Sequence, residues 1–488
     1  MFEQLLEEKF LTPLDLFFAD LHAPQTQSER AFFAALMAVS REGHLCLDLE
    51  HLTLPDALLA PVLEGAKTVS SLYIRRLSNL FYLERNYDHE TRIFNELQHL
   101  SFKVKPLDYL HSAGLTEEQQ KALDLALSHT LTIIEGGPGT GKTFLTSHLV
   151  QAMGPSARVI LAAPTGKAAA RLKQFNPQAI CGTLHSILGI KSQQQLARGK
   201  SYVQADLIII DESSMIDARL LAFFLSSIHA GQRVVFLGDG NQLPPVESGS
   251  LFTDLVDLLP TAHLRKCLRS DRLEVLQLAR DILEGKPVTP HQTLSKEFIL
   301  QKALENFPHP SQKETVSHEN SFCILSPVRE GPFGVNVLNE EIFQLFYRRM
   351  KPQDVWAVPI LITRTDYEAG LYNGEVGLLW RKKEKLLHAE FASEQGMRKI
   401  PASALPPYEL GYVLSVHKSQ GSEFDHVLAL VPPGSEKFGR EVLYTAVTRA
   451  KYSVVLCGDG ETVQKTASRS SHRRSGLKMR WELKDQKT

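Results

Sequence analysis

The stretch TIIEGGPGTGKTFLTS, residues 132–147, decides the fold. An apolar run breaks into a glycine-rich turn, and the turn ends in Lys142 and Thr143. Glycines at this spacing let backbone N–H groups curl around phosphates, while the lysine reaches the β and γ oxygens and the threonine hydroxyl ligates Mg²⁺. The sequence therefore predicts a phosphate-binding loop between a strand and a helix. Its predicted nucleotide-binding residues are Gly136, Gly137, Pro138, Gly139, Thr140, Gly141, Lys142 and Thr143.

Short aliphatic runs on both sides of the loop indicate the fold class. Runs that are apolar at nearly every position suit parallel strands buried on both faces of a sheet. One series lies between residues 131 and 239 and a second between 322 and 459, so the sequence predicts an α/β protein with two parallel-sheet domains. The runs are LTIIEG, RVILAAP, DLIIID and RVVFLGD in the first series, and FCILSP, HVLALVP and YSVVLCGD in the second.

Changes in composition and hydrophobic spacing along the chain also predict its division into domains. Residues 1–110 are rich in Leu and Phe at helical spacing, which predicts a mostly helical domain. The first parallel-sheet domain is placed at 111–262 and the second at 263–488. Within the second, residues 352–408 are β-rich and carry an Asn-Gly turn signal, which predicts a small β insertion.

Two further segments favour ATP hydrolysis. The run ADLIIIDESSMID ends a strand in two acids, so Asp211 would ligate the metal and Glu212 would polarise a water toward the γ-phosphate. Gln242 follows the next strand, where its amide either contacts the γ-phosphate or belongs to an ordinary polar turn. A simple kinase rarely needs the acid pair, and the sequence has no Asn-Lys-x-Asp motif to read guanine. The expected ligands are therefore ATP and Mg²⁺.

Composition narrows the protein class. A chain of 488 residues predicts two to four domains, and 43% hydrophobic with 22% charged residues is typical of a globular protein. Five scattered cysteines indicate reduced thiols and a cytoplasmic setting, with neither a disulfide framework nor a zinc site. No apolar stretch reaches the ~18 residues of a membrane span, and the acidic start is no signal peptide. Residues 1–60 hold ten Asp or Glu against three Lys or Arg, which suits either a protein-docking surface or a solvated face.

The segments and their order resemble the superfamily 1 helicases over residues 115–460 or so. LTEEQQKAL is similar to the adenine-reading Q motif, with Gln119 at the best spacing and Gln120 beside it. LAAPTGKAAARL and GTLHSILG resemble two strand-binding motifs, and CLRSD supplies Arg269 where motif IV carries an arginine. LSVHKSQGSEFDHVLALV is similar to motif V, although Ser415 stands where threonine is usual. EVLYTAVTRAKYSVVLCGD resembles motif VI, with Arg449.

The detailed sequences of several segments resemble one family of these helicases, the RecD subunits of RecBCD (exonuclease V). APTGKAAARL, GDGNQLPPVESGS, SVHKSQGSEFD and LYTAVTRAK carry the likeness, with LSPVREGPFGVNVLNEEI and RRSGL. Residues 14–49 are similar to that family's N-terminal domain, which docks on the RecC subunit. The resemblance implies RecC-like and RecB-like partners in a heterotrimer, single-stranded DNA and duplex ends as substrates, 5′-to-3′ travel, and no nuclease activity in this subunit.

The resemblance also implies roles for single residues. Two RecA-like domains would clamp one ATP, with Lys142, Glu212, Gln242, Arg269 and Arg449 as the catalytic set. Gly421 and Glu423 would also touch the nucleotide, and Thr143 and Asp211 would hold the metal. Few aromatic residues lie in the motifs, so contacts to the DNA backbone should outweigh base stacking. The implied DNA-binding residues are Pro164, Thr165, Gly166, Lys167, Thr183, His185, Ser415, His417 and Lys418.

Two alternatives remain open at this point. One is a stand-alone repair helicase of RecD-like type, which would unwind a forked duplex without partners. The other is a nucleotide-gated structural subunit that binds DNA without moving. The intact Lys142, Glu212 and Arg449 argue against the second, because a degenerate motor commonly loses one of these residues.

Overall fold

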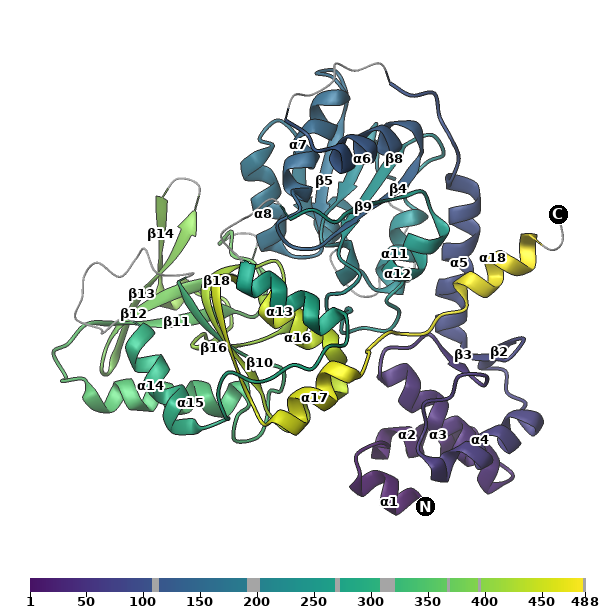
Figure 1. Cartoon of the computed structure of the whole chain (residues 1–488), viewed down its shortest axis with the longest axis horizontal. Coiled ribbons are helices and arrows are strands. Elements are labelled where there is room, and N and C mark those ends of the chain that lie inside the picture. The colour runs from purple at the N-terminus through teal and green to yellow at the C-terminus, as the bar shows by residue number, and fades with distance from the viewer. Residues whose placement is uncertain are drawn as a thin grey trace.

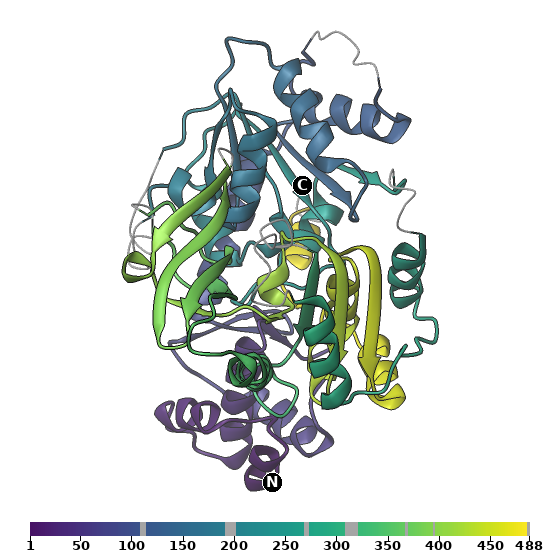
Figure 2. The same cartoon turned by 90° about the vertical axis from the view of Figure 1, so that its left-hand side faces the viewer.

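The computed structural model describes residues 1–107, 114–190, 202–267, 273–307, 321–366, 369–393 and 396–485. The strands within these ranges form four sheets. A helical N-terminal lobe lies below a first α/β domain, and a second α/β domain lies beside them with a β subdomain at its outer end (Figure 1). The view from the side shows the sheet of the subdomain next to that of the second domain (Figure 2).

The first α/β domain is built on a wholly parallel sheet. Its strands are β4 (Leu131–Gly136), β5 (Val159–Ala163), β6 (Ile180–Thr183), β7 (Leu207–Ile210), β8 (Arg233–Gly238) and β9 (Thr261–Leu264). Their order is β6-β5-β7-β8-β4-β9, and the pairings are parallel. The four aliphatic runs quoted from the sequence all became strands of this sheet, which confirms the predicted fold class.

Helices cover both faces of this sheet, which explains the unbroken apolar runs. Side chains alternate between the faces of a strand, and in β7 Ile208 and Ile210 enter one core while Leu207 and Ile209 enter the other. The helices of the domain are α6 (Glu117–Ser128), α7 (Lys142–Ala152), α8 (Gly166–Phe175), α9 (Leu184–Ile187), α11 (Ala218–Leu225) and α12 (Phe252–Leu258). Helices α6, α7 and α8 pack in the second of these cores, and α11 and α12 in the first.

The N-terminal lobe has its own small core around Phe32, Leu36, Leu58 and Val62. Its elements are α1 (Phe2–Glu7), α2 (Pro13–Leu21), α3 (Gln27–Arg41), β1 (Cys46–Asp48), α4 (Asp56–Thr68), β2 (Ile74–Leu77) and β3 (Leu80–Leu83). The strands form an antiparallel sheet in the order β1-β3-β2, so the lobe is less purely helical than the sequence predicted.

Helix α5 (Glu84–Leu100) lies within the predicted 1–110 domain but packs elsewhere. Ile93, Leu97 and Leu100 stand four and three residues apart on one helical face and join the core of the first α/β domain. The separate N-terminal core therefore ends near β3, and α5 serves as a covering helix of the first α/β domain's sheet.

The second α/β domain repeats the parallel design. Its elements are α13 (Leu273–Leu283), α14 (Lys296–Asn306), β10 (Phe322–Ser326), α15 (Val335–Arg349), β16 (Val413–Ser415), β17 (Phe424–Val431), α16 (Gly439–Val447), β18 (Ala450–Gly458) and α17 (Gly460–Ser468). The sheet runs β16-β10-β17-β18 with parallel pairings. The domain boundary predicted after residue 262 falls inside β9, whose last residues pair with β4.

The β-rich stretch predicted at 352–408 corresponds to the β subdomain. Its strands are β11 (Trp356–Ile362), β12 (Val376–Lys382), β13 (Lys385–Ser393), β14 (Gly396–Pro401) and β15 (Tyr408–Leu410). They form an antiparallel sheet in the order β14-β13-β12-β11-β15. Strand β15 leads directly into β16, so the subdomain is rooted in the second domain's sheet.

The last described residues, 469–485, form a return segment that leaves the second domain. It runs from α17 past the N-terminal lobe to α18 (Leu477–Asp485), which lies beside α5 (Figure 1). Leu45 donates its N–H to the Arg474 carbonyl at 2.9 Å, and Arg480 Nε donates to the fully buried Glu90 carboxylate at 2.7 Å. The sequence division had placed this segment in the second domain alone. Among the helices of the described ranges, none has the length and apolarity that a bilayer crossing needs.

Candidate ATPase site and nucleic-acid interface

The phosphate-binding loop lies where the sequence predicted it. Strand β4 ends at Gly136 and α7 begins at Lys142. Gly139 and Gly141 have φ of 77° and 86°, values that favour glycine over any residue with a side chain. The loop therefore turns tightly into α7, whose first N–H groups have no partner within the helix and suit an anion.

A pocket of about 330 Å³ opens above this loop, a size typical of small-molecule sites. Residues of both α/β domains form its wall. From the predicted sets these are Gly137, Pro138, Gly139, Thr140, Gly141, Lys142, Thr143, Asp211, Glu212 and Gln242 of the first domain, with Gly421, Glu423 and Arg449 of the second. The fold thus brings together residues more than 300 positions apart in the chain, as 142 and 449 are.

Lys142 folds back over the loop. Its ammonium group donates to the carbonyl oxygens of Gly136 and Gly137. These contacts hold the charge at the floor of the pocket. The lysine is therefore positioned to bind the phosphates of a nucleotide.

Asp211 and Glu212 follow β7 at the carboxyl edge of the sheet. Glu212 has φ 52° and ψ 39°, a left-handed conformation that costs a non-glycine residue about 1–3 kcal/mol and often marks a functional site. Burial, with the neighbouring Asp211 charge, raises the pKa of Glu212, while Arg449 and Lys142 oppose the rise. The result is a desolvated carboxylate with the character of a general base.

Thr143 and Asp211 line the same pocket. A hydroxyl and a carboxylate are hard oxygen donors, the kind that Mg²⁺ prefers. The donors present therefore fit the predicted Mg²⁺ ion.

Gln242 is buried in the wall of the pocket. Its amide nitrogen donates to Asp239 Oδ2 at 3.4 Å, and its Oε1 has no hydrogen-bond partner among the described residues. A buried oxygen without a donor is costly. Gln242 thus offers an unsatisfied acceptor at the pocket, which suits a hydrogen bond from a water or another donor bound there.

Arg449, immediately before β18, is also buried. Its guanidinium donates to the carbonyl oxygens of Thr445 and Ser422, each at 3.2 Å. Within the described part of the chain, no carboxylate forms an ion pair with it at the 4 Å limit of such contacts. A buried cation held by neutral carbonyls in a phosphate pocket is positioned to meet a phosphate charge. The other predicted arginine, Arg269, lies outside the described residues.

Gln119, the predicted adenine-reading residue, makes two hydrogen bonds within the first domain. Its side-chain oxygen accepts from Thr116 N–H at 3.0 Å, and its amide donates to the Thr140 carbonyl at 3.1 Å. It is 1% exposed and is not part of the pocket wall. In this structure Gln119 caps α6 and supports the phosphate-binding loop from behind.

Four residues of the wall were missed by the sequence analysis. Phe144 and Ser147 lie on α7, and Arg171 and Phe175 on α8. The members of each pair are three or four residues apart on one helical face, and both rings are about half exposed. Their helical spacing, beside the phosphate-binding loop and the segment LAAPTGKAAARL, could have indicated that these residues line the nucleotide site.

The residues predicted to bind DNA follow strands at the carboxyl edges of both sheets. Thr165 and Thr183 cap α8 and α9, accepting from Ala168 N–H at 3.3 Å and Ser186 N–H at 3.1 Å. Each hydroxyl keeps its own proton to donate. The remaining members of the first-domain set are Pro164, Gly166, Lys167 and His185, and burial lowers the pKa of His185.

Two of these first-domain residues face the second domain. A Cβ at Gly166 would lie 2.3 Å from the Tyr372 side chain of the β subdomain, so a ring covers the backbone that we expected phosphates to approach. Lys167 Nζ lies 5.9 Å from the Phe424 ring centre.

In the second domain, Ser415 ends β16 and accepts from Lys418 N–H at 3.3 Å. Burial lowers the pKa of His417 to about 4, so its ring is neutral at physiological pH. Lys418 Nζ forms an ion pair with Glu409 at 2.6 Å.

Comparison with known proteins finds family models for three parts of the chain. Family models match residues 7–81 (RecBCD enzyme subunit RecD, N-terminal domain), 114–301 (AAA domain) and 410–457 (UvrD-like helicase C-terminal domain). A Pif1 helicase structure from Candida albicans aligns with a TM-score of 0.47 and 17% identity, covering 77% of this chain and 100% of that one.

Curated relatives cover nearly the whole chain. The RecBCD enzyme subunit RecD of Mycobacterium tuberculosis (strain ATCC 25618 / H37Rv) is 30% identical over 95% of this chain and 94% of its own. The subunit of the same name from Mycolicibacterium smegmatis is 29% identical over 94% of each. The ATP-dependent RecD2 DNA helicase of Deinococcus radiodurans is 30% identical over 74% of this chain and 52% of its own. The chain therefore belongs to the RecD family of DNA helicases.

Proposed function

We propose that this protein is an ATP-driven motor that moves 5′-to-3′ along single-stranded DNA as a subunit of a RecBCD-like recombinational repair complex. The observation that carries the proposal is the shared pocket, in which Lys142 and Glu212 of the first domain face Arg449 of the second. Neither domain holds the full set, so turnover depends on how the two domains sit together. The direction of travel is taken from the family resemblance.

Each group has a distinct task in hydrolysis. Lys142 binds the β and γ oxygens, and Glu212 takes the proton of the attacking water. The amide nitrogen of Gln242, which donates to Asp239 Oδ2 at 3.4 Å in this structure, would donate to the γ-phosphate when a nucleotide is bound. Arg449 stabilises the charge of the transition state, as does Arg269 by resemblance; arginines in this role can contribute about 10³–10⁵ in rate. Mg²⁺, held by Thr143 and Asp211, would neutralise charge on the β and γ phosphates.

Movement follows from two grips on one strand. The loops after β5 and β6 belong to the first domain and the loop after β16 to the second. Their hydroxyls and cations suit phosphate oxygens, which carry no sequence information. When hydrolysis changes the spacing of the domains, it changes the spacing of the grips.

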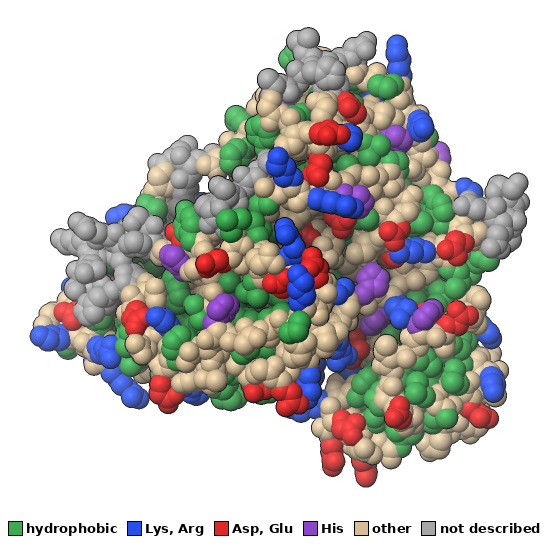
Figure 3. All heavy atoms as spheres, in the orientation of Figure 1, with side chains coloured by type: hydrophobic (Ala, Val, Ile, Leu, Met, Phe, Trp, Pro, Cys, Tyr) green, Lys and Arg blue, Asp and Glu red, His purple; other side chains and the backbone are tan. Residues whose placement is uncertain are grey.

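One face of α2 supports docking on a partner protein. Leu14, Phe17 and Leu21 stand three and four residues apart and are 55%, 61% and 67% exposed. The N-terminal lobe shows grouped hydrophobic atoms on its visible face, at the lower right of Figure 3, and such patches mark interaction sites. We assign this face to a RecC-like subunit, with a RecB-like subunit completing a cytoplasmic heterotrimer that acts on duplex ends.

The test of the motor is ATP turnover by the full chain with and without a single-stranded oligonucleotide, followed by unwinding of forks that carry a 5′ or a 3′ tail. Turnover should rise with DNA, and only the 5′-tailed fork should be opened. Turnover that is indifferent to DNA would count against the motor and for the nucleotide-gated structural subunit.

A second experiment addresses the complex. RecB-like and RecC-like subunits should co-purify with the chain from its native cell. A Leu14→Asp, Phe17→Asp variant should lose them while keeping its ATP turnover. Efficient unwinding by the isolated chain, with no partner recovered, would favour the stand-alone helicase.

A further inference from the structure

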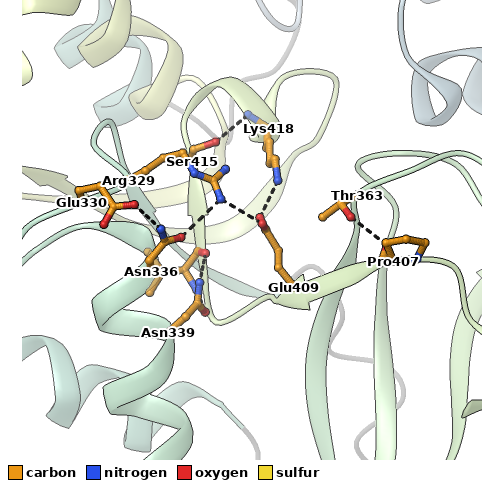
Figure 4. A network of polar contacts seen from close by, with 10 residues as sticks. Arg329, Glu330, Asn336, Asn339, Thr363, Pro407, Glu409, Ser415 and Lys418 are labelled. Carbon is orange, nitrogen blue, oxygen red and sulfur yellow. Dashed lines mark hydrogen bonds and ion pairs between the residues drawn. The ribbon is translucent and has the colours of Figure 1, made fainter.

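A single carboxylate at the root of the β subdomain holds two cations from different loops (Figure 4). Glu409 Oε1 accepts from Lys418 Nζ at 2.6 Å, and Glu409 Oε2 accepts from Arg329 Nη2 at 3.1 Å. Arg329 and Glu409 are 80 positions apart in the chain, and Glu409 and Lys418 are 9 apart. They meet where the loops after β10 and β16 pass strand β15.

The position of the two cations follows from the sheet. Strands β10 and β16 are parallel neighbours with Ser326 opposite Ser415, so the loops after them leave the same edge. Arg329 stands three residues beyond β10 and Lys418 three residues beyond β16. Arg329 is therefore the counterpart of a lysine already expected to bind DNA; it lies in the quoted segment LSPVREGPFGVNVLNEEI, to which the sequence analysis gave no DNA-binding role.

Both cations remain accessible from solvent. The side chains are 47% exposed for Arg329 and 26% for each of Lys418 and Glu409. Arg329 Nη2 also lies 3.4 Å from Asn336 Oδ1, and Asn336 in turn donates to Glu330 at 2.6 Å. These bonds orient the guanidinium while leaving its other N–H groups for a ligand.

The arrangement has the chemistry of a phosphate site. A carboxylate presents two oxygens to two cations, and a DNA phosphodiester presents two non-bridging oxygens in the same way. Ion pairs between partly exposed side chains contribute little to folding stability, so stabilisation of the fold is a weak explanation for the pairing. Competition between the Glu409 carboxylate and a phosphate for the same two cations explains it better.

We propose that Arg329 and Lys418 together bind one backbone phosphate of the strand, and that Glu409 occupies the place of this phosphate until DNA displaces it. The inference rests on the proposed function, since it concerns the second-domain grip. Glu409 lowers the affinity of that grip for DNA and re-pairs the cations when the strand leaves. A grip that must release at every step gains from such an internal competitor.

The experiment measures the dissociation constant of a fluorescent oligo-dT strand by anisotropy at several salt concentrations, with the full chain. Glu409→Gln keeps the size of the side chain and removes its charge. It should tighten binding about twofold to fivefold, because DNA no longer has to break the ion pairs. Arg329→Gln should weaken binding and reduce the slope of log affinity against log salt by about 0.7, the value for one phosphate contact on a single strand.

Two controls sharpen the result. Glu341→Gln removes the same charge from a pair with Lys296 between α14 and α15, with 35% exposure of the glutamate, and should leave DNA affinity unchanged. In the Arg329→Gln background, Glu409→Gln should tighten binding less than it does alone, because one of its two cations is gone.

The outcomes are distinct. Glu409→Gln that weakens binding or leaves it unchanged, in a variant that melts like wild type, overturns the displacement by phosphate. An unaltered salt slope in Arg329→Gln overturns the phosphate contact. Wild-type protein that binds no DNA at all would instead overturn the proposed function and this inference with it.

Discussion

The Tyr444 hydroxyl donates to Asp239 Oδ2 at 2.8 Å across the cleft between the two α/β domains. The same carboxylate oxygen accepts from the Gln242 amide at 3.4 Å, and Leu243 N–H donates to Thr445 Oγ1 at 2.8 Å beside it. Both Tyr444 and Asp239 are buried. Tyr444 in the second domain therefore reaches the first-domain segment that holds Gln242 against the nucleotide pocket.

Tyr444→Phe removes this hydroxyl and nothing else. We expect kcat for DNA-stimulated ATP turnover to fall about tenfold with little change in KM, because the loss of one hydrogen bond of about 1–1.5 kcal/mol loosens Gln242. The Tyr444 ring, whose hydroxyl lies beside Gly137 of the phosphate-binding loop, is kept. Steady-state kinetics check this. Tyr412→Phe, a change in a buried tyrosine outside the pocket, should leave kcat unaltered; an equal fall in both variants would contradict the link.

Lys142→Gln should lower ATP turnover by about 10²-fold or more, because the pocket loses the cation that meets the phosphates. Among the residues that the structure describes, the Lys142 ammonium group donates to two carbonyl oxygens of its own loop, so the melting temperature and partner binding should change little. Turnover and thermal unfolding are both measured. Lys121→Gln on α6, a 72% exposed lysine paired with Glu117, is the matched control. Loss of partner assembly in Lys142→Gln would count against the assigned role.

The pH dependence of turnover should report on Glu212. Burial raises its pKa above the 4.5 of an ordinary glutamate, and the base must be ionised to accept a proton. We therefore expect kcat to reach a plateau on the alkaline side and to fall as the pH drops through the raised pKa, still above 4.5. Glu212→Gln should lose about 10²–10⁴ in rate and the acidic limb of the profile. A folded wild-type protein with full activity at pH 4.5 would refute this account.

Gly476→Ala should weaken the return segment. A Cβ there would lie 1.9 Å from the Tyr82 hydroxyl and 2.7 Å from Leu80 Cδ1, so we expect a loss of about 1–3 kcal/mol in the free energy of unfolding. Gly460→Ala, where a Cβ meets nothing within 4 Å, should be neutral or slightly stabilising. Denaturant unfolding of both variants decides the matter, and equal stabilities would show that the segment yields easily.

The parts that the sequence predicted well are those whose chemistry is local. The phosphate-binding loop and the acid pair each lie within a few residues of the strand that positions them, so spacing alone indicated that Lys142 and Asp211 would lie near one another, as they do in the pocket wall. The parallel strands were equally accessible, because burial on both faces leaves an unbroken apolar run such as residues 207–210.

The parts that were missed depend on contacts between distant segments. Gln119 and Gly166 sit in recognisable motifs, yet their neighbours Thr140 and Tyr372 decide what each does in the fold. No local sequence pattern predicts that α5 covers the sheet of the first α/β domain. The pairing of Arg329 with Glu409 likewise appears only once β10 and β15 are both in place.

The return segment brings the end of the second domain back into contact with the N-terminal part of the protein. The covalent chain passes from the N-terminal lobe through the first domain to the second, and residues 469–485 then carry it back to Leu45 and Glu90. A load that DNA applies to the second domain therefore has two routes to the lobe, one through the cleft and one that bypasses it. In the proposed complex, a partner bound to the lobe would therefore stay linked to the second domain through residues 469–485 even while the cleft is open.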